Sequence, residues 1–421
     1  MNVSTLATEM SVNPEPVVPC GAVVRTSEET RIEVLRTFAE IEGLRSTWEQ
    51  WKWHPNSDLD SYLTVLRSLP GADPIVIVLY RGTSPEVILV GRAETGDLSL
   101  RIGYKDLAKV TARKLVFIYA GLLGTPSADK CAALIQAVKN ALRQGHGQVA
   151  FFNSVPTDSP LYAAALSQSF WTRDHVPSLQ THRCMELPSS AEEFYRSLSP
   201  KVRKNLGWQA RRFEKDFKGS LRLQCFQQED DFAEMFLEVE TIAQKTYQRG
   251  LGVGFENNRI LRDRLALEAR KGWFRGFVLY VGERPVAFWV GKVYRETFHS
   301  DFMGYDPDLA KYSPGMYLIT RVIEEFCNSK VESGVRNIDF GLGDAQYKQV
   351  LGTSDWQEAS LHLFAPTMAG LGLNLFRTPA ALFNRFAQRV LKKSSVLKLK
   401  RAWRNQAKRR SGSQDDAQRT N

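Results

Sequence analysis

The chain has 421 residues, of which 43% are hydrophobic and 24% are charged, a balance typical of globular proteins and not of disordered ones. Its length predicts two to three domains of roughly 100 to 200 residues each. Residues 359–421 contain thirteen Lys and Arg and two Asp, so this segment carries +11 of formal charge while the whole chain carries +10. The residues before it are close to neutral, which argues against nucleic-acid binding by the folded body.

The sequence also argues against a secretory signal, a membrane-spanning helix and a zinc site. Residues 1–28 contain three prolines and no basic start followed by an apolar run, so we expect a disordered leader rather than a secretory signal. No stretch reaches the roughly 18 apolar residues of a membrane-spanning helix. The five cysteines form no CxxC pair and no zinc-ligand spacing with histidine, which predicts reduced thiols, no metal site and a cytoplasmic location; they are Cys20, Cys131, Cys184, Cys225 and Cys327.

An internal repeat organises the chain. The segment VLYRGTSPEVILVGR, residues 78–92, aligns without a gap with VLYVGERPVAFWVGK, residues 278–292. Each copy has a β-rich run, a turn with Gly82 or Gly282, and a second β-rich run, which predicts two hairpins. The recurrence predicts two domains of similar architecture.

The elements on either side of the hairpins recur in the same order. An alternating strand at 32–34 precedes a helix that Thr37 and Glu40 begin as a capping box, and the second copy repeats this pattern from residue 221. Downstream of each hairpin, Thr125 or Ser313 stands before a proline that is expected to begin a helix. A buried-type strand follows each helix, so each half reads as strand, helix, hairpin, strand, helix and strand.

The second half carries a family resemblance in three segments, RKNLGWQARRFEK, YDPDLAKYSPG and NIDFGLGDAQYKQVLG. These resemble the BioF2-like, GNAT-type acetyltransferase domain of the cellulose-biosynthesis acetyltransferases, a domain related to the Fem peptidyltransferases. The resemblance covers residues 195–364 well and, through the repeat, residues 31–185 more weakly. It implies an α/β fold of tandem GNAT-like domains, each a mixed central sheet flanked by helices. The expected bounds are 29–187 and 188–366, followed by a basic helical tail at 367–421.

The resemblance also implies a donor site. Acyl-CoA, acetyl or longer, would lie as co-substrate between two central strands, with its phosphates near Ser313, Gly315, Met316 and Tyr317. Ser as a cap, Pro at the helix start and Gly for close approach fit such a loop. The usual GNAT pyrophosphate loop is absent, however, and the Fem relatives use aminoacyl-tRNA, so both donors stay open.

Acyl transfer to an amine or hydroxyl needs a base and a proton donor. Strand alternation predicts His299 and Asp301 on one face, opposite Phe298 and Phe302, where they would form an acid–base pair. Asp339 follows an apolar strand residue, where a carboxylate is costly unless it is paired or functional. The structural alternatives are a half-buried strand histidine for His299 and a simple ion pair for Asp339.

Two further candidates come from the family pattern. Tyr347 and Lys348 match it and would act as proton donor and acceptor anchor, although a surface Tyr-Lys pair at a helix start is equally ordinary. Cations on the helix that follows Tyr195 would meet donor phosphates or an acidic acceptor, or simply face solvent; they are Lys201, Arg203, Lys204, Arg211 and Arg212.

The tail predicts a basic amphipathic helix. No acidic residue lies between Glu358 and Asp415, and Thr378-Pro379 is expected to begin the helix. Its apolar residues recur near helical spacing between Arg and Lys: Leu382, Phe386, Val390 and Leu397. An anionic membrane surface contacted by residues 377–410 is the first interpretation, and nucleic-acid binding and a disordered tail are its rivals.

Together these patterns predict an acyltransferase that moves an acyl group from acyl-CoA to an amine or hydroxyl acceptor. The resemblance implies a role in cell-envelope or exopolysaccharide biosynthesis, at the inner face of the membrane. The alternatives are a Fem-like, aminoacyl-tRNA-dependent peptidyltransferase and a non-catalytic membrane-associated scaffold.

Overall fold

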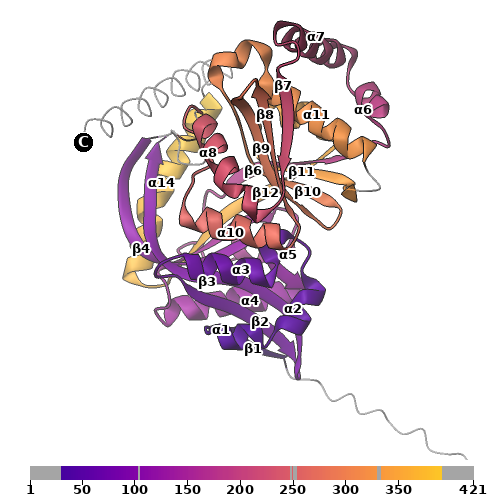
Figure 1. Cartoon of the computed structure of the whole chain (residues 1–421). Coiled ribbons are helices and arrows are strands. Elements are labelled where there is room, and N and C mark those ends of the chain that lie inside the picture. The colour runs from indigo at the N-terminus through magenta and orange to yellow at the C-terminus, as the bar shows by residue number, and fades with distance from the viewer. Residues whose placement is uncertain (1–29, 103–104, 247–248, 250–253, 330–332, 391–421) are drawn as a thin grey trace, which may run out of the picture.

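The computed structural model describes residues 30–390 except 103–104, 247–248, 250–253 and 330–332. Its described strands form one mixed sheet of twelve in the order β1-β2-β3-β4-β5-β12-β6-β11-β10-β9-β8-β7. Helices cover both faces of this sheet, and the two halves of the chain lie at its two ends (Figure 1). The fold is therefore mixed α/β, with the sheets of the two halves joined edge to edge.

The elements of the first half are β1 (Thr30–Leu35), α1 (Phe38–Glu42), α2 (Arg45–Trp51), η1 (Pro55–Ser57), α3 (Leu59–Ser68), β2 (Asp73–Arg81), β3 (Ser84–Ile102), β4 (Lys105–Gly124), α4 (Ala128–Arg143), β5 (Val149–Pro156), α5 (Pro160–Leu166) and β6 (Ser178–Glu186). Those of the second half are α6 (Ala191–Ser197), α7 (Pro200–Asp216), β7 (Leu221–Phe226), η2 (Glu229–Asp231), α8 (Phe232–Ala243), α10 (Arg259–Arg270), β8 (Phe274–Val281), β9 (Arg284–Tyr294), β10 (Thr297–Tyr305), η3 (Pro307–Tyr312), α11 (Pro314–Asn328), β11 (Asn337–Leu342), α13 (Gln346–Leu351), β12 (Ser354–Phe364) and α14 (Met368–Val390).

The two hairpins repeat in detail. In β2 and β3 the register shifts between Leu79 and Tyr80, and in β8 and β9 it shifts at the equivalent Leu279 and Tyr280. Both turns contain a glycine with positive φ, 58° at residue 82 and 59° at residue 282. A matching irregularity and a matching turn confirm the two predicted hairpins.

Each half also contains a pair of parallel strands that separate. Pairing of β4 with β5 ends at Phe117 and Phe152, and pairing of β10 with β11 ends at His299 and Asp339. The longer strand of each pair continues beyond that point, to Gly124 in β4 and to Tyr305 in β10. The sheet is therefore open on one side of each last pair, and in the second half that pair consists of two predicted site residues.

The halves exchange their last strands. β12 lies between β5 and β6, and β6 lies between β12 and β11. A boundary at 187 and 188 thus leaves one strand of each half next to the other half's sheet. The exchange brings β6, β11 and β12 side by side at the centre of the molecule.

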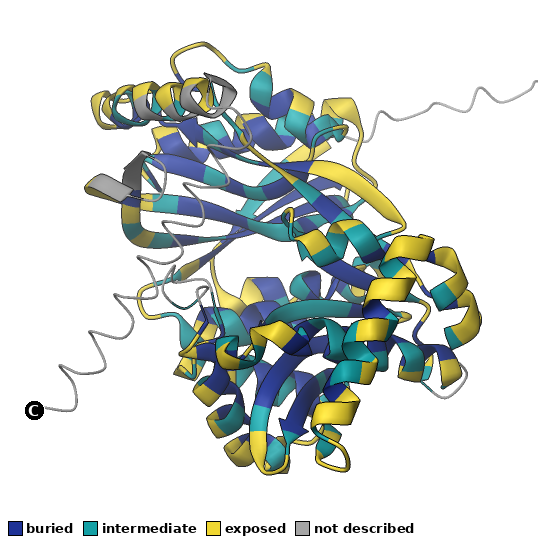
Figure 2. Ribbon diagram, turned by 90° about the horizontal axis from the view of Figure 1, so that it is seen from above, coloured by how far each residue is buried: buried dark blue, intermediate teal, exposed yellow. Residues whose placement is uncertain are grey.

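Apolar clusters lie on both faces of the sheet. In the first half one face packs on α4 and α5 and the other on α1, α2 and α3. In the second half α6, α7 and α11 cover one face, and α8 and α10 cover the other. Buried residues follow the strands, and exposed ones follow the outer faces of the helices (Figure 2).

Two predicted helix starts are wrong. The helix after Thr125 begins two residues later, where Ser127 accepts a hydrogen bond from the Lys130 N–H, because the Thr125 N–H still bonds Glu86 O at the end of the strand pair. In the tail, Pro379 lies inside α14, which already begins at Met368. None of the helices within the described residues has the length and hydropathy of a membrane-spanning segment.

Candidate active site

A buried carboxylate lies where β10 and β11 separate. Asp339 Oδ1 is 2.6 Å from His182 Nε2, and Asp339 Oδ2 is 3.2 Å from His299 Nδ1. The Gly341 N–H also donates to Asp339 Oδ1 at 2.7 Å. Burial alone would raise the pKa of Asp339, but its hydrogen bonds with His182 and His299, together with the charge of His182, hold it well below its usual range. Asp339 is therefore ionised and joins three strands.

His182 lies between two carboxylates. Its Nδ1 is 3.1 Å from Glu358 Oε1, which also accepts from Trp356 Nε1 at 2.7 Å. The Trp356 ring stacks on the imidazole, with centroids 4.3 Å apart. Burial would lower the pKa of His182, but its hydrogen bonds to Asp339, Cys184 and Glu358 outweigh this and raise it to about 11. At neutral pH His182 is an imidazolium.

The first half of the chain contributes two rings to the same place. The His54 ring meets the His299 ring edge-on at 4.7 Å, and it meets the Tyr119 ring at 4.9 Å. The Tyr119 hydroxyl lies 3.3 Å from His182 Nδ1. Burial, aided by the nearby His299, lowers the pKa of His54 to about 3, so this imidazole is neutral. We call His54, Tyr119, His182, His299, Asp339 and Glu358 the central cluster.

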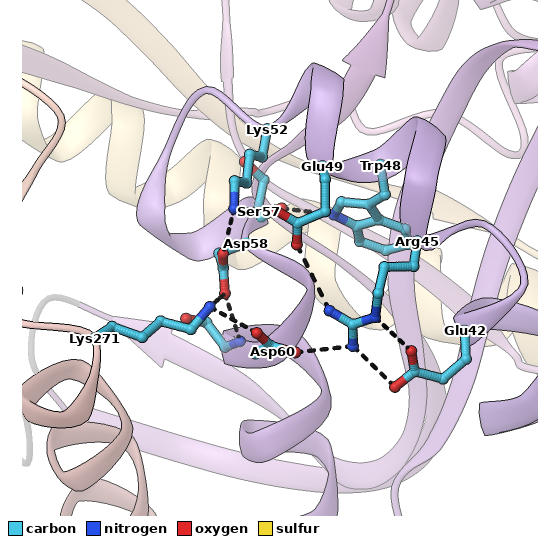
Figure 3. Close-up of polar contacts among 10 residues, drawn as sticks. Glu42, Arg45, Trp48, Glu49, Lys52, Ser57, Asp58, Asp60 and Lys271 are labelled. Atoms are coloured by element: carbon cyan, nitrogen blue, oxygen red, sulfur yellow. Dashed lines mark hydrogen bonds and ion pairs between the residues drawn. The ribbon is translucent and has the colours of Figure 1, made fainter.

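Ion pairs across the two halves hold the segment that carries His54. Lys271, at the end of α10, lies 2.8 Å from both Asp58 Oδ1 and Asp60 Oδ2 (Figure 3). The Asp58 side chain is fully buried and also caps α3 through the Ser61 N–H. The first half thus presents His54 from a loop that a lysine of the second half fixes.

The same loop is fixed from within the first half. Trp48 Nε1 donates to Ser57 O at 2.7 Å, and Arg45 bridges Glu42 and Asp60 at 2.8 and 2.9 Å (Figure 3). The Trp48 ring is fully buried among α1, α2 and α3. These contacts leave η1 little freedom. A fixed turn suits His54, because its ring must be held precisely against a side chain of the other half.

Asp301 belongs to a different network from His299. A register shift between Ser300 and Phe302 makes Asp301 a bulge residue, and its Oδ2 lies 2.9 Å from Lys292 Nζ and 3.1 Å from Arg264. The structure therefore pairs His299 with Asp339 and Asp301 with two cations.

The same bulge overturns the predicted faces. Phe298 packs in the core with α6, α7 and α11, whereas Phe302 packs on the opposite face with α8 and α10. The expectation that the two rings share a face is wrong, because the extra residue shifts the alternation after Ser300.

The start of α11 is the predicted phosphate site. Ser313 is in the left-handed region, φ 55°, and its side chain makes no capping bond, so the expected serine cap is wrong; Pro314 does occupy the first turn. A Cβ on Gly315 would lie 3.2 Å from Tyr305 Cδ1, so a larger side chain there must displace that ring. First-turn N–H groups lack partners within a helix and attract anions.

The other residues near this start have roles of their own. Met316 packs against the core, and the Tyr317 hydroxyl donates to Glu214 on α7 at 3.0 Å. The Arg212 guanidinium lies 5.3 Å from the Tyr312 ring beside the helix start. A phosphate at this place would therefore be bound by backbone groups and by cations of α7, not by the Tyr317 hydroxyl.

Tyr347 and Lys348 lie on α13, next to β11. The Tyr347 ring packs edge-on against Phe340, and Lys348 Nζ donates to Leu342 O at 2.7 Å. Burial lowers the pKa of Lys348 to about 8, against a weaker opposing attraction to Asp339. The amine therefore exists in both protonation states near neutral pH.

Among the described residues, two groups of side chains have donor atoms close enough to one another for a metal ion. Both contain Asp339, one with His54 and His299 and the other with His182 and Cys184, and within each group the atoms lie within 4.8 Å of one another. Each carboxylate oxygen of Asp339 already has an imidazole nitrogen within hydrogen-bonding distance. Burial raises the pKa of the Cys184 thiol, so this residue is a poor thiolate donor.

The sequence analysis missed four members of the central cluster. His54, Tyr119, His182 and Glu358 come from a 3-10 turn and three strands that are far apart in the chain. No motif joins them. Their one signal was a polar residue within a strand, as in His182, which stands between Thr181 and Arg183 and is buried.

The raised pKa of His182 predicts how the stability of the protein depends on pH. In the folded protein the pKa of His182 is about 11, whereas its ordinary pKa is 6.5. The contribution of His182 to stability is therefore complete below pH 6.5 and is lost as the pH rises toward 11. We expect the free energy of unfolding to fall with pH in this window, by up to about 1.4 kcal/mol per pH unit. In His182→Gln the slope should flatten, measured by chemical denaturation from pH 6 to 10. The lowered pKa of Lys348 makes stability rise with pH in both proteins, so this effect cancels when their slopes are compared. Equal slopes would contradict a raised pKa for His182.

Comparisons with known proteins bear on the second half most directly. Residues 200–349 match the family model described as an acetyltransferase (GNAT) domain. This stretch runs from α7 into α13 and contains His299, Asp339 and the start of α11. The second half of the chain therefore contains a GNAT-type acetyltransferase domain. Comparison with curated proteins gives no match.

Several solved structures resemble the whole described chain. FemX aligns with 78% of this chain and 96% of its own, at 10% identity and a TM-score of 0.47. A tandem GNAT protein from the clavulanic acid biosynthesis pathway aligns with 80% and 100%, at 11% identity and 0.46. L-PGS from Bacillus licheniformis aligns with 80% and 96%, at 14% identity and 0.43. With all three TM-scores below 0.5, these likenesses carry no argument about function.

Proposed function

We propose that the chain is an acyltransferase that moves an acyl group from acyl-CoA to an amine or hydroxyl acceptor at one site between its two halves. The observation that carries the proposal is the convergence of His182 and His299 on Asp339 at the point where β10 and β11 separate. The GNAT family match over the same strands supports it. A buried, charged cluster with shifted pKa values is costly to maintain and is typical of functional sites.

In this proposal His299 is the base. Its Nδ1 contacts Asp339, which leaves Nε2 to take the proton of the attacking amine or hydroxyl. Asp339 fixes the ring and stabilises the imidazolium that forms, as the carboxylate does in a catalytic triad. The His182 imidazolium adds positive charge beside Asp339 and so keeps it ionised. Asp301 braces β10 through its ion pairs with Lys292 and Arg264.

Tyr347 and Lys348 are the proposed proton donor and acceptor anchor. Tyr347 is the group placed to protonate the leaving thiolate. Lys348, with a pKa of about 8, is largely protonated at neutral pH and offers a charged hydrogen-bond donor to the acceptor. Burial raises the pKa of Cys184, the thiol nearest the cluster, which favours direct transfer over an acyl-enzyme on that residue.

The donor would bind through the start of α11, whose first turn contains Ser313, Gly315, Met316 and Tyr317. The positive end of the helix, the small Gly315 and the adjacent Arg212 fit a phosphate group there. Acetyl-CoA is the simplest donor of this class, and longer acyl chains are equally consistent with this arrangement. Participation in envelope or exopolysaccharide synthesis is part of the proposal and rests on the sequence resemblance.

The first experiment is a thermal shift with acetyl-CoA, longer acyl-CoAs and free CoA. A ligand at 100 times its Kd stabilises the folded state by about 2.7 kcal/mol, which raises the unfolding midpoint by a few degrees. Gly315→Asp should abolish the shift, because the carboxylate repels phosphate. Since Gly315 is buried and its new side chain must displace the Tyr305 ring, the midpoint of the ligand-free variant is measured alongside. Ala128→Asp, at the equivalent start of α4 in the first half, is the matched control and should keep the shift.

Other outcomes would redirect the proposal. No shift with any CoA species would overturn the donor, and salt-sensitive binding of aminoacyl-tRNA in its place would favour the peptidyltransferase alternative. Binding of acyl-CoA without turnover against a broad panel of amines and hydroxyl compounds would favour a scaffold.

A further inference from the structure

One face of α14 is apolar and exposed. Met368, Leu375 and Leu382 recur every seven residues and Phe386 follows four later, a spacing that places them along one side of a helix. Together with Phe383 they are between 50% and 88% exposed. Exposed apolar residues are ordinary one at a time, but a continuous row of them indicates a contact surface.

The opposite face of α14 is attached to the body of the protein. Asn374 Nδ2 donates to Trp171 O at 2.9 Å, and Arg377 lies 2.7 Å from the buried Asp174. Leu373 is buried beside Phe364. Figure 1 shows α14, in yellow, along the long hairpin of β3 and β4. These contacts fix the orientation of the helix, so its apolar row faces outward by construction.

Two more exposed aromatic residues lie beside the same helix. Phe170 and Trp171 precede β6, are 61% and 69% exposed, and have ring centroids 5.5 Å apart. The backbone of Trp171 is the group that α14 holds through Asn374. We call Met368, Leu375, Leu382, Phe383 and Phe386 the apolar face.

The charge of the C-terminal segment indicates which kind of partner binds the apolar face. Between Glu358 and Asp415 the sequence has no acidic residue, and the twelve Lys and Arg there include the exposed Arg385 and the closely following Lys392 and Lys393. A nucleic acid would match the cations but gains nothing from outward Leu and Phe side chains. A second copy of the chain would bring two strongly basic segments together. An anionic lipid surface satisfies both, because the cations meet headgroups while the apolar side chains enter the acyl boundary.

We propose that the apolar face is a docking surface for an anionic lipid bilayer, with α14 lying flat on it and the basic residues after it contacting headgroups. The proposal differs from the sequence interpretation in its location: the contact begins at Met368, not at residue 377. It does not depend on the acyl-transfer reaction.

The test is flotation of the full-length protein with vesicles of phosphatidylcholine, with and without phosphatidylglycerol. We expect binding to the anionic vesicles that weakens with salt, and little binding to phosphatidylcholine alone. The double variant Leu382→Asp and Phe386→Asp should lower vesicle binding about tenfold or more. Lys392→Glu with Lys393→Glu should also lower it. Leu237→Asp, at an exposed leucine on α8, is the matched control and should bind like the wild type.

Each contrary result has a defined meaning. Binding that depends on salt but is unchanged in Leu382→Asp with Phe386→Asp would overturn the apolar contact. Tight binding to RNA or DNA with no vesicle flotation would overturn the lipid assignment. A dimer that dissociates in the double variant, again without vesicle binding, would assign the face to a second copy.

Discussion

Replacing His299 by Gln is expected to lower kcat for acyl transfer by about 10²- to 10⁴-fold, the usual contribution of a general base. The reaction is followed as release of the CoA thiol, with whichever acyl-CoA stabilises the protein. Glutamine keeps the size of the side chain and a group that can bond Asp339, so the unfolding midpoint should change little. Asp339→Asn should impair turnover as well, because it no longer fixes the imidazole through a charged partner.

A control histidine separates chemistry from folding. His146 is partly buried, like His299. None of the contacts described above joins it to a member of the central cluster. His146→Gln should leave kcat unchanged. If His299→Gln retained kcat within a factor of ten while the protein stayed folded, His299 would not be the base, and Lys348 would become the next candidate.

Replacing Lys292 by Met should destabilise the protein by about 3–5 kcal/mol, the usual cost of leaving buried carboxylates without their cation. Lys292 Nζ lies 2.6 Å from Glu268 Oε1 and 2.9 Å from Asp301 Oδ2, and its side chain is only 2% exposed. Burial would raise the pKa of Asp301, but Lys292 and Arg264 hold it below its usual value. Loss of one cation leaves Arg264 to balance both acids. The measurement is the shift in denaturation midpoint at constant pH.

An exposed ion pair provides the comparison. Arg196 and Glu192 pair on the surface of α6, with side chains 71% and 74% exposed. Arg196→Met should change stability by no more than a few tenths of a kcal/mol, roughly what surface pairs contribute. Equal effects of Lys292→Met and Arg196→Met would show that the buried network around Asp301 contributes no more than a surface contact.

The local elements of this fold could be predicted because each depends on residues close together in sequence. The repeated hairpins follow from alternation and from Gly82 and Gly282, and the capping box of Thr37 and Glu40 forms as expected, with both reciprocal hydrogen bonds. The bulge at Asp301 could not be predicted, since an extra residue in a strand depends on its partner strand. The same limit applies to the predicted start of the tail helix, because α14 is attached through Asn374 and Arg377 to residues far away in the sequence.

The candidate site shows the limit more clearly. Alternation tells which face a strand residue occupies, but not which strand lies next to it. His182 and Glu358 meet because β6 and β12 are neighbours, and His54 joins them because Lys271 holds its loop from the other half. Sequence reasoning found His299 and Asp339 within one domain, yet assigned His299 a partner two residues away rather than forty.

The exchange of β6 and β12 also sets an order of events during synthesis. Until residues 354–364 have left the ribosome, β5 has an unpaired edge, and the first half cannot complete its sheet. Such an edge is open to pairing with another nascent chain. The central cluster can therefore form only late in synthesis, because β12, the last strand among the described residues, carries Glu358 into it.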